Sequence, residues 1–351
     1  MQLSPLAAKA ADIIDFAPRV IAWQRQHGRH DLPWQQTRDP YRVWLSEIML
    51  QQTQVTTVLS YYQRFLLAFP TVADLAAAPQ DAVMQLWAGL GYYSRARNLH
   101  HAAHMVVAEF GGKFPESAAD LQRLPGVGPS TAAAIAAFCF GQRSAIFDAN
   151  VQRVLARYWG YAQDLTQAAH KKQLWTFAED LLPTQDLAQT MPAYTQGLMD
   201  LGATVCSARK PNCAACPLAS GCAALAQGEP TALPIISKKL QRREQPIYLL
   251  WQQNRDLLRL QRRAPKGIWG GLYCLPEISH AQYQQLAGDK QNQTLPPIKH
   301  VLTHRDLQLH IVRQHSVSVA EPGAGEVWQP IATLAQLGLP QPISKLLLAA
   351  A

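Results

Sequence analysis

Residues 124–138 read LPGVGPSTAAAIAAF and place two glycines immediately before an alanine-rich helix. Gly126 and Gly128 have no Cβ, so their backbone N–H groups can approach a ligand closely. The N-terminus of the helix that follows carries a partial positive charge, which favours an anion such as phosphate. An ordinary tight turn is the alternative interpretation, with Ser130 as the cap of the next helix.

A second polar motif follows an apolar lead-in, in IFDANVQRVLAR at 146–157. It supplies Asp148 and Asn150. Asp148 could cap a helix that begins near Val151, or it could serve as a charged group in a site. The motif alone leaves both interpretations open.

Four of the six cysteines are crowded together, in the pattern C-x6-C-x2-C-x5-C. They are Cys206, Cys213, Cys216 and Cys222. This density indicates a metal centre in a reducing cytoplasm rather than a disulfide framework. Zinc and a [4Fe–4S] cluster both accept four thiolates, but zinc modules usually pair two C-x2-C elements, and only one is present. The spacing therefore favours iron and sulfur over zinc.

The length and composition bound the remaining possibilities. A chain of 351 residues suits two domains, each with a core of its own. No apolar stretch is long enough for a membrane span, and the N-terminus lacks the features of a signal peptide. The formal charge of +8 favours a polyanionic partner without proving one.

The organisation of the chain changes once. Residues 8 to about 225 have the pattern of helices joined by short turns, and the segment from Tyr41 to Phe69 has the spacing of an amphipathic helix. The segment GEPTALPIISKKLQRREQP, 228–246, indicates an exposed linker. Short β-like runs follow it. We expect an all-α domain over 1–227 and an α+β domain over 247–351.

One acidic residue stands in an apolar setting, in WLSEIMLQQT at 44–53. Burying Glu47 among these side chains would raise its pKa and favour its protonated form. The alternative is a glutamate on the solvent side of an amphipathic helix.

These motifs, in this order, resemble the helix-hairpin-helix DNA glycosylase superfamily in its endonuclease III branch. DPYRVWLSEIMLQQTQV at 39–55, GLGYYSRARNLH at 89–100 and GIWGGLYCLP at 267–276 are similar to the MutY-type adenine DNA glycosylases. The resemblance implies an all-α helix-hairpin-helix glycosylase domain with the hairpin at about 120–140. It also implies an iron–sulfur cluster loop at 206–222 with a [4Fe–4S] cluster, and a C-terminal α+β Nudix-like domain.

The resemblance also implies roles for individual residues. Glu47 would protonate the target adenine, Asp148 would stabilise or trap the sugar cation, Asn150 would orient the reacting groups, and Ser130 would be a nearby polar contact. Bifunctional relatives carry a lysine at the position of Ser130, and a hydroxyl cannot form a Schiff base. The remaining DNA and substrate contacts would be Gly126 and Gly128 in the hairpin, Gln52 and Tyr92 at the opened stack, and Trp34, Leu50 and Asp200 at the adenine.

In the second domain, the resemblance implies recognition of 8-oxoguanine. Only Glu277 occurs in the stretch where a hydrolytic Nudix helix would need several glutamates, so a binding domain is expected. The recognition loop, Phe-Ser-His in the family, is Leu302-Thr303-His304 here. Thr303 retains a hydroxyl, whereas Leu302 lacks the ring. His304 could also be a surface histidine at a strand end.

The expected function is monofunctional excision of adenine mispaired with 8-oxoguanine or guanine in double-stranded DNA. The alternative is an endonuclease III-like glycosylase and AP lyase acting on damaged pyrimidines. We expect a monomer in the bacterial cytoplasm, acting on nucleoid DNA and not on membranes. The sequence does not identify any protein partners.

Overall fold

The computed structural model describes residues 10–237, 242–314, 319 and 321–349. Parts of the predicted domains and linker lie outside these residues, namely 1–9, 238–241, 315–318, 320 and 350–351. None of the described helices combines the length and apolar character needed to cross a membrane.

The described residues divide between two compact units, each built from two stretches of chain. The first unit is Met1–Val55 with Ala102–Lys239, and the second is Thr56–His101 with Leu240–Ala351. This grouping differs from the linear division predicted at the linker. The reason is that helices within 56–101 bond to the C-terminal segment, as when Arg97 Nη1 donates to the Gly270 carbonyl over 2.5 Å.

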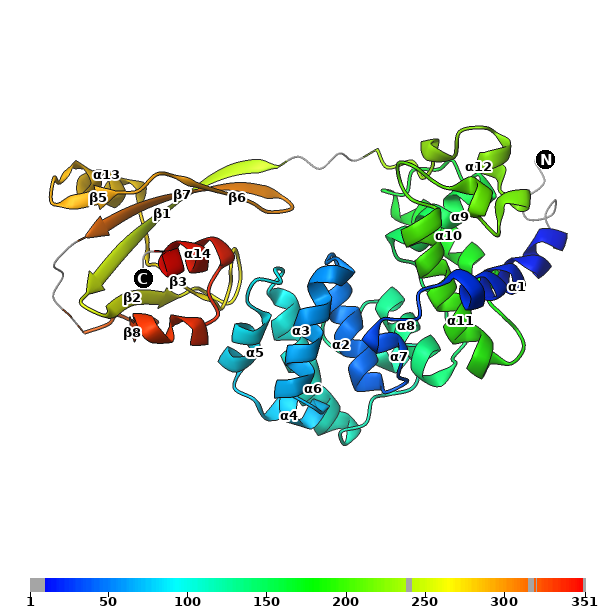
Figure 1. Cartoon of the computed structure of the whole chain (residues 1–351), viewed down its shortest axis with the longest axis horizontal. Helices are drawn as coiled ribbons and strands as arrows, with labels where there is room; N and C mark the ends of the chain where they lie inside the picture. The colour runs from blue at the N-terminus through cyan, green and yellow to red at the C-terminus, as the bar shows by residue number, and fades with distance from the viewer. Residues whose placement is uncertain (1–9, 238–241, 315–318, 320, 350–351) are drawn as a thin grey trace. The chain divides into compact units, whose positions relative to one another are not determined.

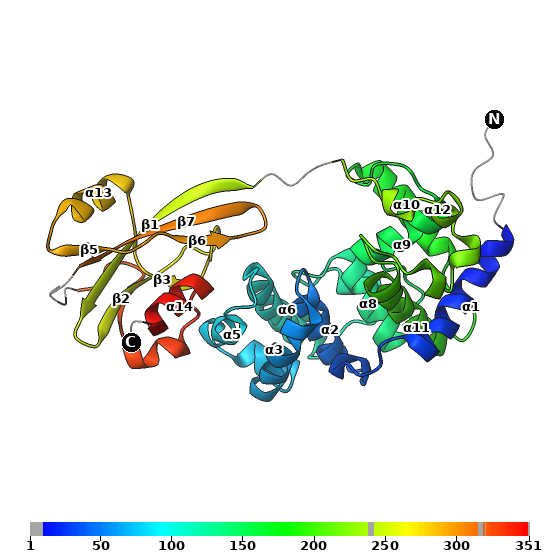
Figure 2. The same cartoon turned by 45° about the horizontal axis from the view of Figure 1, so that its top comes forward.

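The first unit is helical. Its elements are α1 (Ala10–His27), η2 (Pro33–Gln35), α2 (Pro40–Leu50), α7 (Ala118–Leu121), α8 (Pro129–Phe140), α9 (Ala149–Trp159), α10 (Ala168–Asp180), α11 (Leu187–Asp200), a π-helical turn η3 (Leu201–Val205), η4 (Cys213–Ala215), η5 (Ala219–Gly221), α12 (Ala223–Ala226) and η6 (Pro230–Ala232). Helix α1 lies along α11, as Figures 1 and 2 both show. Helix α6 (Ser94–Phe110) contributes to both units.

Helix α8 is central to the first unit because it is made largely of alanine. Its residues 132–137 are all buried, and their small side chains let α2, α7 and α11 contact it. The helix begins after Gly128 with Pro129 in its first turn and ends at Gly141, which adopts a left-handed φ of 62°. Both ends follow the usual preference for proline at the start and glycine after the end.

The second unit combines helices with a sheet. Its elements are α3 (Val55–Ala68), α4 (Val72–Ala77), α5 (Gln80–Trp87), the start of α6, β1 (Arg243–Asn254), β2 (Leu257–Arg262), β3 (Tyr273–Cys274), β4 (Glu277–Ile278), α13 (His280–Gly288), β5 (Asn292–Thr294), β6 (Ile298–Val301), β7 (Arg305–Gln314), β8 (Glu326–Pro330), η7 (Ile331–Gln336) and α14 (Gln341–Ala349). Strand order is β3-β2-β1-β7-β5, with β4 on β1, β6 on β7 and β8 on β2. The long strands β1 and β7 pair in parallel at its centre, and α13 packs against them (Figure 1).

Two predictions about local structure were wrong. The predicted amphipathic helix from Tyr41 to Phe69 is two helices, because the chain turns between α2 and α3 and Gln52 takes a left-handed φ of 57°. The predicted exposed linker, 228–246, is shorter at both ends. Strand β1 already starts at Arg243, where it pairs with Arg305, and the buried Leu233 fixes the first part of the segment to the helical unit.

The turn after α8 generates a test of packing. A Cβ on Gly141 would lie 2.8 Å from the Ala188 Cα, whereas a Cβ on Gly112, which has a similar left-handed backbone, would meet nothing within 4 Å. We expect Gly141→Ala to lower the free energy of unfolding by about 2–4 kcal/mol and Gly112→Ala by only about 1 kcal/mol. Urea unfolding of both full-length variants measures the difference, and equal losses would show that the close approach is unimportant.

Candidate active site

The first unit contains a cavity of about 330 Å³. Its walls come from the end of α1, the loop to η2, and helices α2, α8 and α11. Of the residues singled out from the sequence, Trp34, Glu47 and Leu50 line it. Trp34 is buried, and an indole beside a carboxyl group in a space of this size could hold an aromatic ligand.

Glu47 lies on α2 between buried Ser46 and Ile48. It is partly buried and lines the cavity. Burial raises the pKa of its carboxyl group to about 8, and the nearby charge of Asp148 adds to this rise. Glu47 is therefore not the solvent-facing glutamate of the alternative interpretation. It is a carboxyl group that keeps its proton near neutral pH.

Asp148 is the N-cap of α9 and also interacts electrostatically with Glu47. Its Oδ1 accepts a hydrogen bond from the Val151 N–H at 2.8 Å, so the capping interpretation is correct as well. Burial raises its pKa, but hydrogen bonds from Val151 and Asn150 and the charge of Arg153 oppose that rise. The net effect is a pKa above the ordinary value, although these contacts partly stabilise the ionised form.

Ser130 and Asn150 are tied to the backbone around Asp148. The Ser130 Oγ accepts a hydrogen bond from the Phe147 N–H at 2.8 Å, directly before Asp148. The Asn150 Oδ1 accepts from Arg153 Nη2 at 2.9 Å. Asn150 also packs closely on Gly202, where a Cβ would come within 2.6 Å of the Asn150 Cβ. Both side chains therefore position the start of α9.

The hairpin keeps its two glycines exposed. Gly126 has a left-handed φ of 82°, and Gly128 precedes the first turn of α8. The side chain of Gln51 donates to the Gly126 carbonyl at 3.3 Å and to Thr131 Oγ1 at 3.4 Å, so the end of α2 is joined to the hairpin. The neighbouring Gln52 is exposed.

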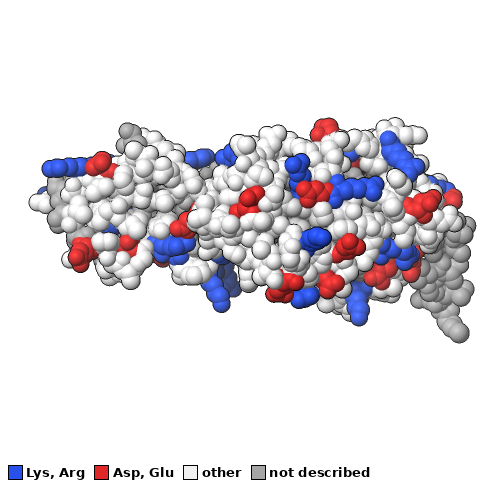
Figure 3. Space-filling model, turned by 90° about the horizontal axis from the view of Figure 1, so that it is seen from below, with Lys and Arg blue, Asp and Glu red and all other residues white. Residues whose placement is uncertain are grey.

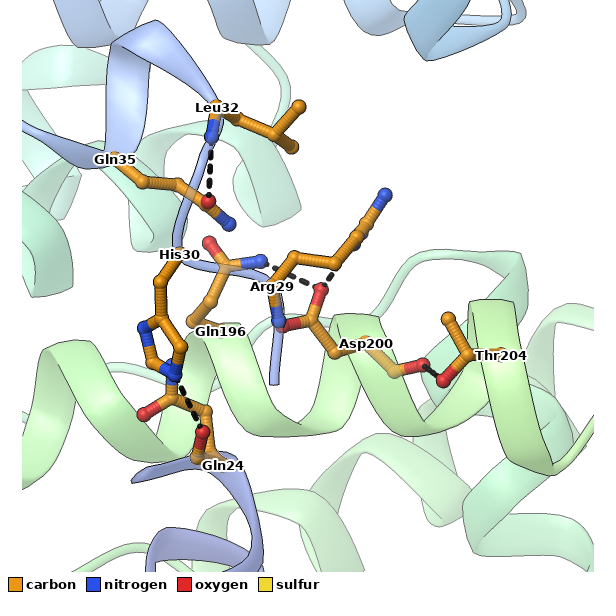
Figure 4. Close-up of polar contacts among 8 residues, drawn as sticks. All are labelled: Gln24, Arg29, His30, Leu32, Gln35, Gln196, Asp200 and Thr204. Carbon is orange, nitrogen blue, oxygen red and sulfur yellow. Dashed lines mark hydrogen bonds and ion pairs between the residues drawn. The ribbon is translucent and has the colours of Figure 1, made fainter. Parts of the chain in front are cut away.

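Asp200 does not line the cavity, which corrects one detail of the prediction. It is fully buried, and its carboxylate accepts from Arg29 Nε at 2.7 Å, from the Arg29 N–H at 2.9 Å and from Gln196 Nε2 at 2.9 Å. Figure 4 shows Arg29 and Gln196 turned towards it. Arg29 and Gln196 line the cavity instead. Their hydrogen bonds to the Asp200 carboxylate fix the positions of both side chains.

Sequence reasoning missed these two residues and Gln35. The pair Arg29 and Asp200 is separated by 171 positions, and no local pattern connects them. Gln35 lines the cavity, its Oε1 accepts from the Leu32 N–H at 3.3 Å, and its buried Nε2 has no hydrogen-bond partner in the described part of the chain. A buried amide donor without a partner is costly unless a ligand completes it.

The four clustered cysteines line a second, small cavity of about 30 Å³ in the same unit. All four are partly buried. Within the described residues, no three His, Cys, Asp or Glu side chains converge closely enough to bind a single metal ion. The thiols thus surround a common space without meeting at one point.

A larger cavity, about 540 Å³, lies within the second unit. The turn between β6 and β7 supplies Leu302, Thr303 and His304, and the loop before α6 supplies Tyr92. Tyr92 is 40% exposed and has a left-handed φ of 48°, so it is not a core aromatic. Its hydroxyl group hydrogen-bonds Thr303 Oγ1.

Comparisons with known proteins identify the family to which the chain belongs. Residues 45–180 match the family of HhH-GPD superfamily base excision DNA repair proteins, and residues 247–349 match the NUDIX domain. The adenine DNA glycosylase of Buchnera aphidicola subsp. Baizongia pistaciae is 35% identical over 95% of this chain and 95% of its own. The chain belongs to the adenine DNA glycosylase family.

Two further comparisons cover part of the chain. The human adenine DNA glycosylase is 44% identical over 61% of this chain and 40% of its own length. The structure of a thermostable thymine-DNA glycosylase superposes with a TM-score of 0.55 and 30% identity, over 63% of this chain and 99% of that one. The predicted MutY-type family and the helical-plus-Nudix-like fold are confirmed. The endonuclease III-like alternative finds no support among the relatives.

The raised pKa of Glu47 has a consequence for stability. Between the ordinary pKa of 4.5 and the folded value of about 8, the folded state holds a proton that the unfolded state has lost. Stability therefore falls as pH rises through this window. We expect Glu47→Gln to raise the free energy of unfolding at pH 8 by on the order of 2 kcal/mol, with little gain at pH 4.

Urea unfolding at several pH values measures this effect. The exposed Glu179 provides the control, because Glu179→Gln should change stability little at any pH. A Glu47→Gln variant with the same pH dependence as the parent would contradict the burial argument.

Proposed function

We propose that this glycosylase hydrolyses the N-glycosidic bond of adenine mispaired with 8-oxoguanine or guanine in double-stranded DNA, without a lyase step. The observation that carries the proposal is the buried Glu47 in the wall of a cavity of about 330 Å³, where burial and the charge of nearby Asp148 raise its pKa to about 8. One group gives a proton while the other remains an anion, as in the carboxyl pairs of glycosidases.

Glu47 is the general acid of this mechanism. Adenine leaves poorly as an anion, and protonation at N7 lets it leave as a neutral molecule. A carboxyl group with a pKa of about 8 is protonated at neutral pH and can transfer its proton as the bond breaks. Departure of the base leaves an oxocarbenium-like sugar, which the Asp148 carboxylate stabilises or traps until water adds.

Ser130 is the reason for excluding the lyase step. Its Oγ is occupied by the Phe147 N–H, and it has no amine with which to attack the sugar aldehyde. Its role in this chain is to position the segment that leads into Asp148, and Asn150 helps to hold the same carboxylate.

The cavity also has groups to hold the flipped base. Trp34 offers a stacking surface and Leu50 an apolar wall. The unpartnered Nε2 of Gln35 can donate to a ring nitrogen of adenine. Arg29 adds a guanidinium held rigid by Asp200, so Asp200 contributes by positioning rather than by contact.

We expect DNA to be bound by exposed groups of both units. The exposed glycines Gly126 and Gly128 present backbone N–H groups to a phosphate, and Gln52 and Tyr92 are exposed side chains suited to fill the opened stack. On the face shown in Figure 3, basic and acidic side chains are interspersed. On that face, binding would depend on individually placed groups rather than on one basic patch.

The cavity of the second unit would receive the base opposite adenine. Its hydroxyl groups from Tyr92 and Thr303 can exchange hydrogen bonds with the O8 and N7–H edge that distinguishes 8-oxoguanine from guanine. His304 is exposed at the same turn and can contact the sugar-phosphate backbone of the DNA.

A [4Fe–4S] cluster would be held by Cys206, Cys213, Cys216 and Cys222. In such a cluster each thiolate would bind a different iron, so four thiols that line one small cavity without converging on one ion support this assignment. When bound, the cluster supplies a rigid cross-link for the loop that carries it.

The two carboxyl groups can be tested by single-turnover excision on a duplex with adenine opposite 8-oxoguanine. We expect Glu47→Gln and Asp148→Asn each to reduce the excision rate at least about 10³-fold with little change in DNA affinity, because both act on bond breaking. The parental rate should fall as pH rises through about 8, where Glu47 loses its proton. Excision by either variant near the parental rate would refute the assignment, and borohydride trapping of a covalent adduct would support the lyase alternative.

The second cavity can be tested with full-length protein, since residues 56–101 belong to the same unit as the C-terminal segment. We expect Thr303→Val to reduce the preference for 8-oxoguanine over guanine opposite adenine by about tenfold, because one hydrogen bond to the lesion is lost. Thr294→Val, on the edge strand β5, is the matched control and should leave the ratio unchanged. An unchanged ratio for Thr303→Val would argue against lesion reading by this cavity.

A further inference from the structure

Arg157 is a buried cation that lies between the four-cysteine loop and the segment leading to the second unit. It is on α9 and only 2% exposed. Nothing in the excision mechanism uses it. A buried guanidinium is costly unless all of its donors are satisfied and its charge is balanced, so its surroundings indicate what it is for.

The donors of Arg157 divide between two segments. Towards the cysteine loop, Nη1 donates to the Ser207 carbonyl at 2.7 Å and to the Cys206 Sγ at 3.3 Å, and Nη2 donates to the Ala208 carbonyl at 2.9 Å. Towards the linker, Nε donates to the Leu233 carbonyl at 2.9 Å. One rigid, planar group therefore bonds to both segments at once.

The charge of Arg157 is balanced by no carboxylate among the described residues, since none lies within 4 Å of it. The acceptor able to carry negative charge is the Cys206 sulfur. A neutral thiol is a weak acceptor, whereas a thiolate makes a charge-assisted hydrogen bond. A metal-bound thiolate at Cys206 would therefore balance the charge of Arg157.

The linker has a second anchor further along. The Leu165 N–H donates to the Ile235 carbonyl at 3.0 Å, and the Ser237 N–H donates to Asp164 Oδ1 at 3.2 Å. With Leu233 buried, residues 230–237 lie fixed along the helical unit. Arg157 joins the inner part of this segment to the cysteine loop, and Asp164 holds the outer part separately.

We infer that Arg157 is a positioning residue that makes the four-cysteine loop and the linker segment 229–237 one structural element. Loading of the loop then determines how firmly the linker is held where it leaves the helical unit. The inference rests on the proposed metal centre but not on which base is excised, so failure of the excision assays would leave it untouched.

The test is hydrogen–deuterium exchange of the full-length, metal-loaded protein. Arg157→Lys keeps the charge but loses the fork of donors. We expect amides in both 207–212 and 229–237 to exchange at least about fivefold faster, because each segment loses at least one hydrogen bond that holds it to α9. The reduction potential of the bound cluster should also fall, because a hydrogen bond to the Cys206 sulfur is lost.

Two variants serve as controls. Arg143 also donates to three backbone carbonyls, those of Glu179, Leu182 and Pro183, but from an exposed position. Arg143→Lys should change neither segment nor the potential. Asp164→Asn should speed exchange at 235–237 and leave 207–212 unchanged.

The outcomes are decisive in both directions. Faster exchange in both segments of Arg157→Lys, with a lowered potential, supports the inference. A change confined to one segment, or an unchanged potential, overturns it. If Arg157→Lys does not fold, the same exchange measurement is made on the parental protein before and after a chelator removes its metal. Faster exchange at 229–237 is then the expected result, and an unchanged linker refutes the coupling.

Discussion

The burial of the Glu47 carboxyl group beside a second acid is the constraint on which the site depends. Burial and the charge of Asp148 both favour the protonated form, and together they raise the pKa to about 8. Such a group is stable only where it can stay neutral. Helix α2 carries Glu47, and Asp148 caps the start of α9. The contacts that hold these two helices therefore keep the two carboxyl groups close enough that ionisation of one opposes ionisation of the other.

The same principle recurs at the other buried charges of the helical unit. Asp148 is held by backbone and side-chain donors, Asp200 by Arg29 and Gln196, and Arg157 by three carbonyls and a sulfur. Each charged group is satisfied by segments distant in the chain. Because removing any one partner leaves an uncompensated buried charge, these contacts also fix the relative positions of α9, α11 and the loops between them.

Much of the fold could be read from the sequence, because its signals are local. Asp148 marks the start of α9, and the composition changes where the sheet begins. Ser130, expected as the cap of the alanine-rich helix, instead lies in the first turn of α8, which Gly128 caps. The candidate acids could be named from their neighbours and from the family resemblance. Their mutual influence could not, since it depends on how α2 and α9 are brought together.

The features that the sequence did not reveal are long-range. Arg29 meets Asp200 across 171 positions, and Arg157 meets Leu233 across 76. The prolines and charges of 228–246 predicted an exposed linker, but composition alone could not predict that the Leu233 carbonyl would accept a hydrogen bond from Arg157. The chain turns between α2 and α3 at Gln52, which has a left-handed backbone conformation. The spacing of apolar residues continues across this position, so the sequence pattern did not reveal the turn.

The most direct test of the central claim is infrared difference spectroscopy of the carboxyl carbonyl stretch across a pH titration, with Glu47→Gln as the reference. A band of a protonated carboxylic acid that is present at pH 7, disappears with a midpoint near pH 8 and is absent from the variant is the predicted result. A Glu47 that has already lost its proton by pH 5, near the ordinary glutamate pKa of 4.5, would contradict the account.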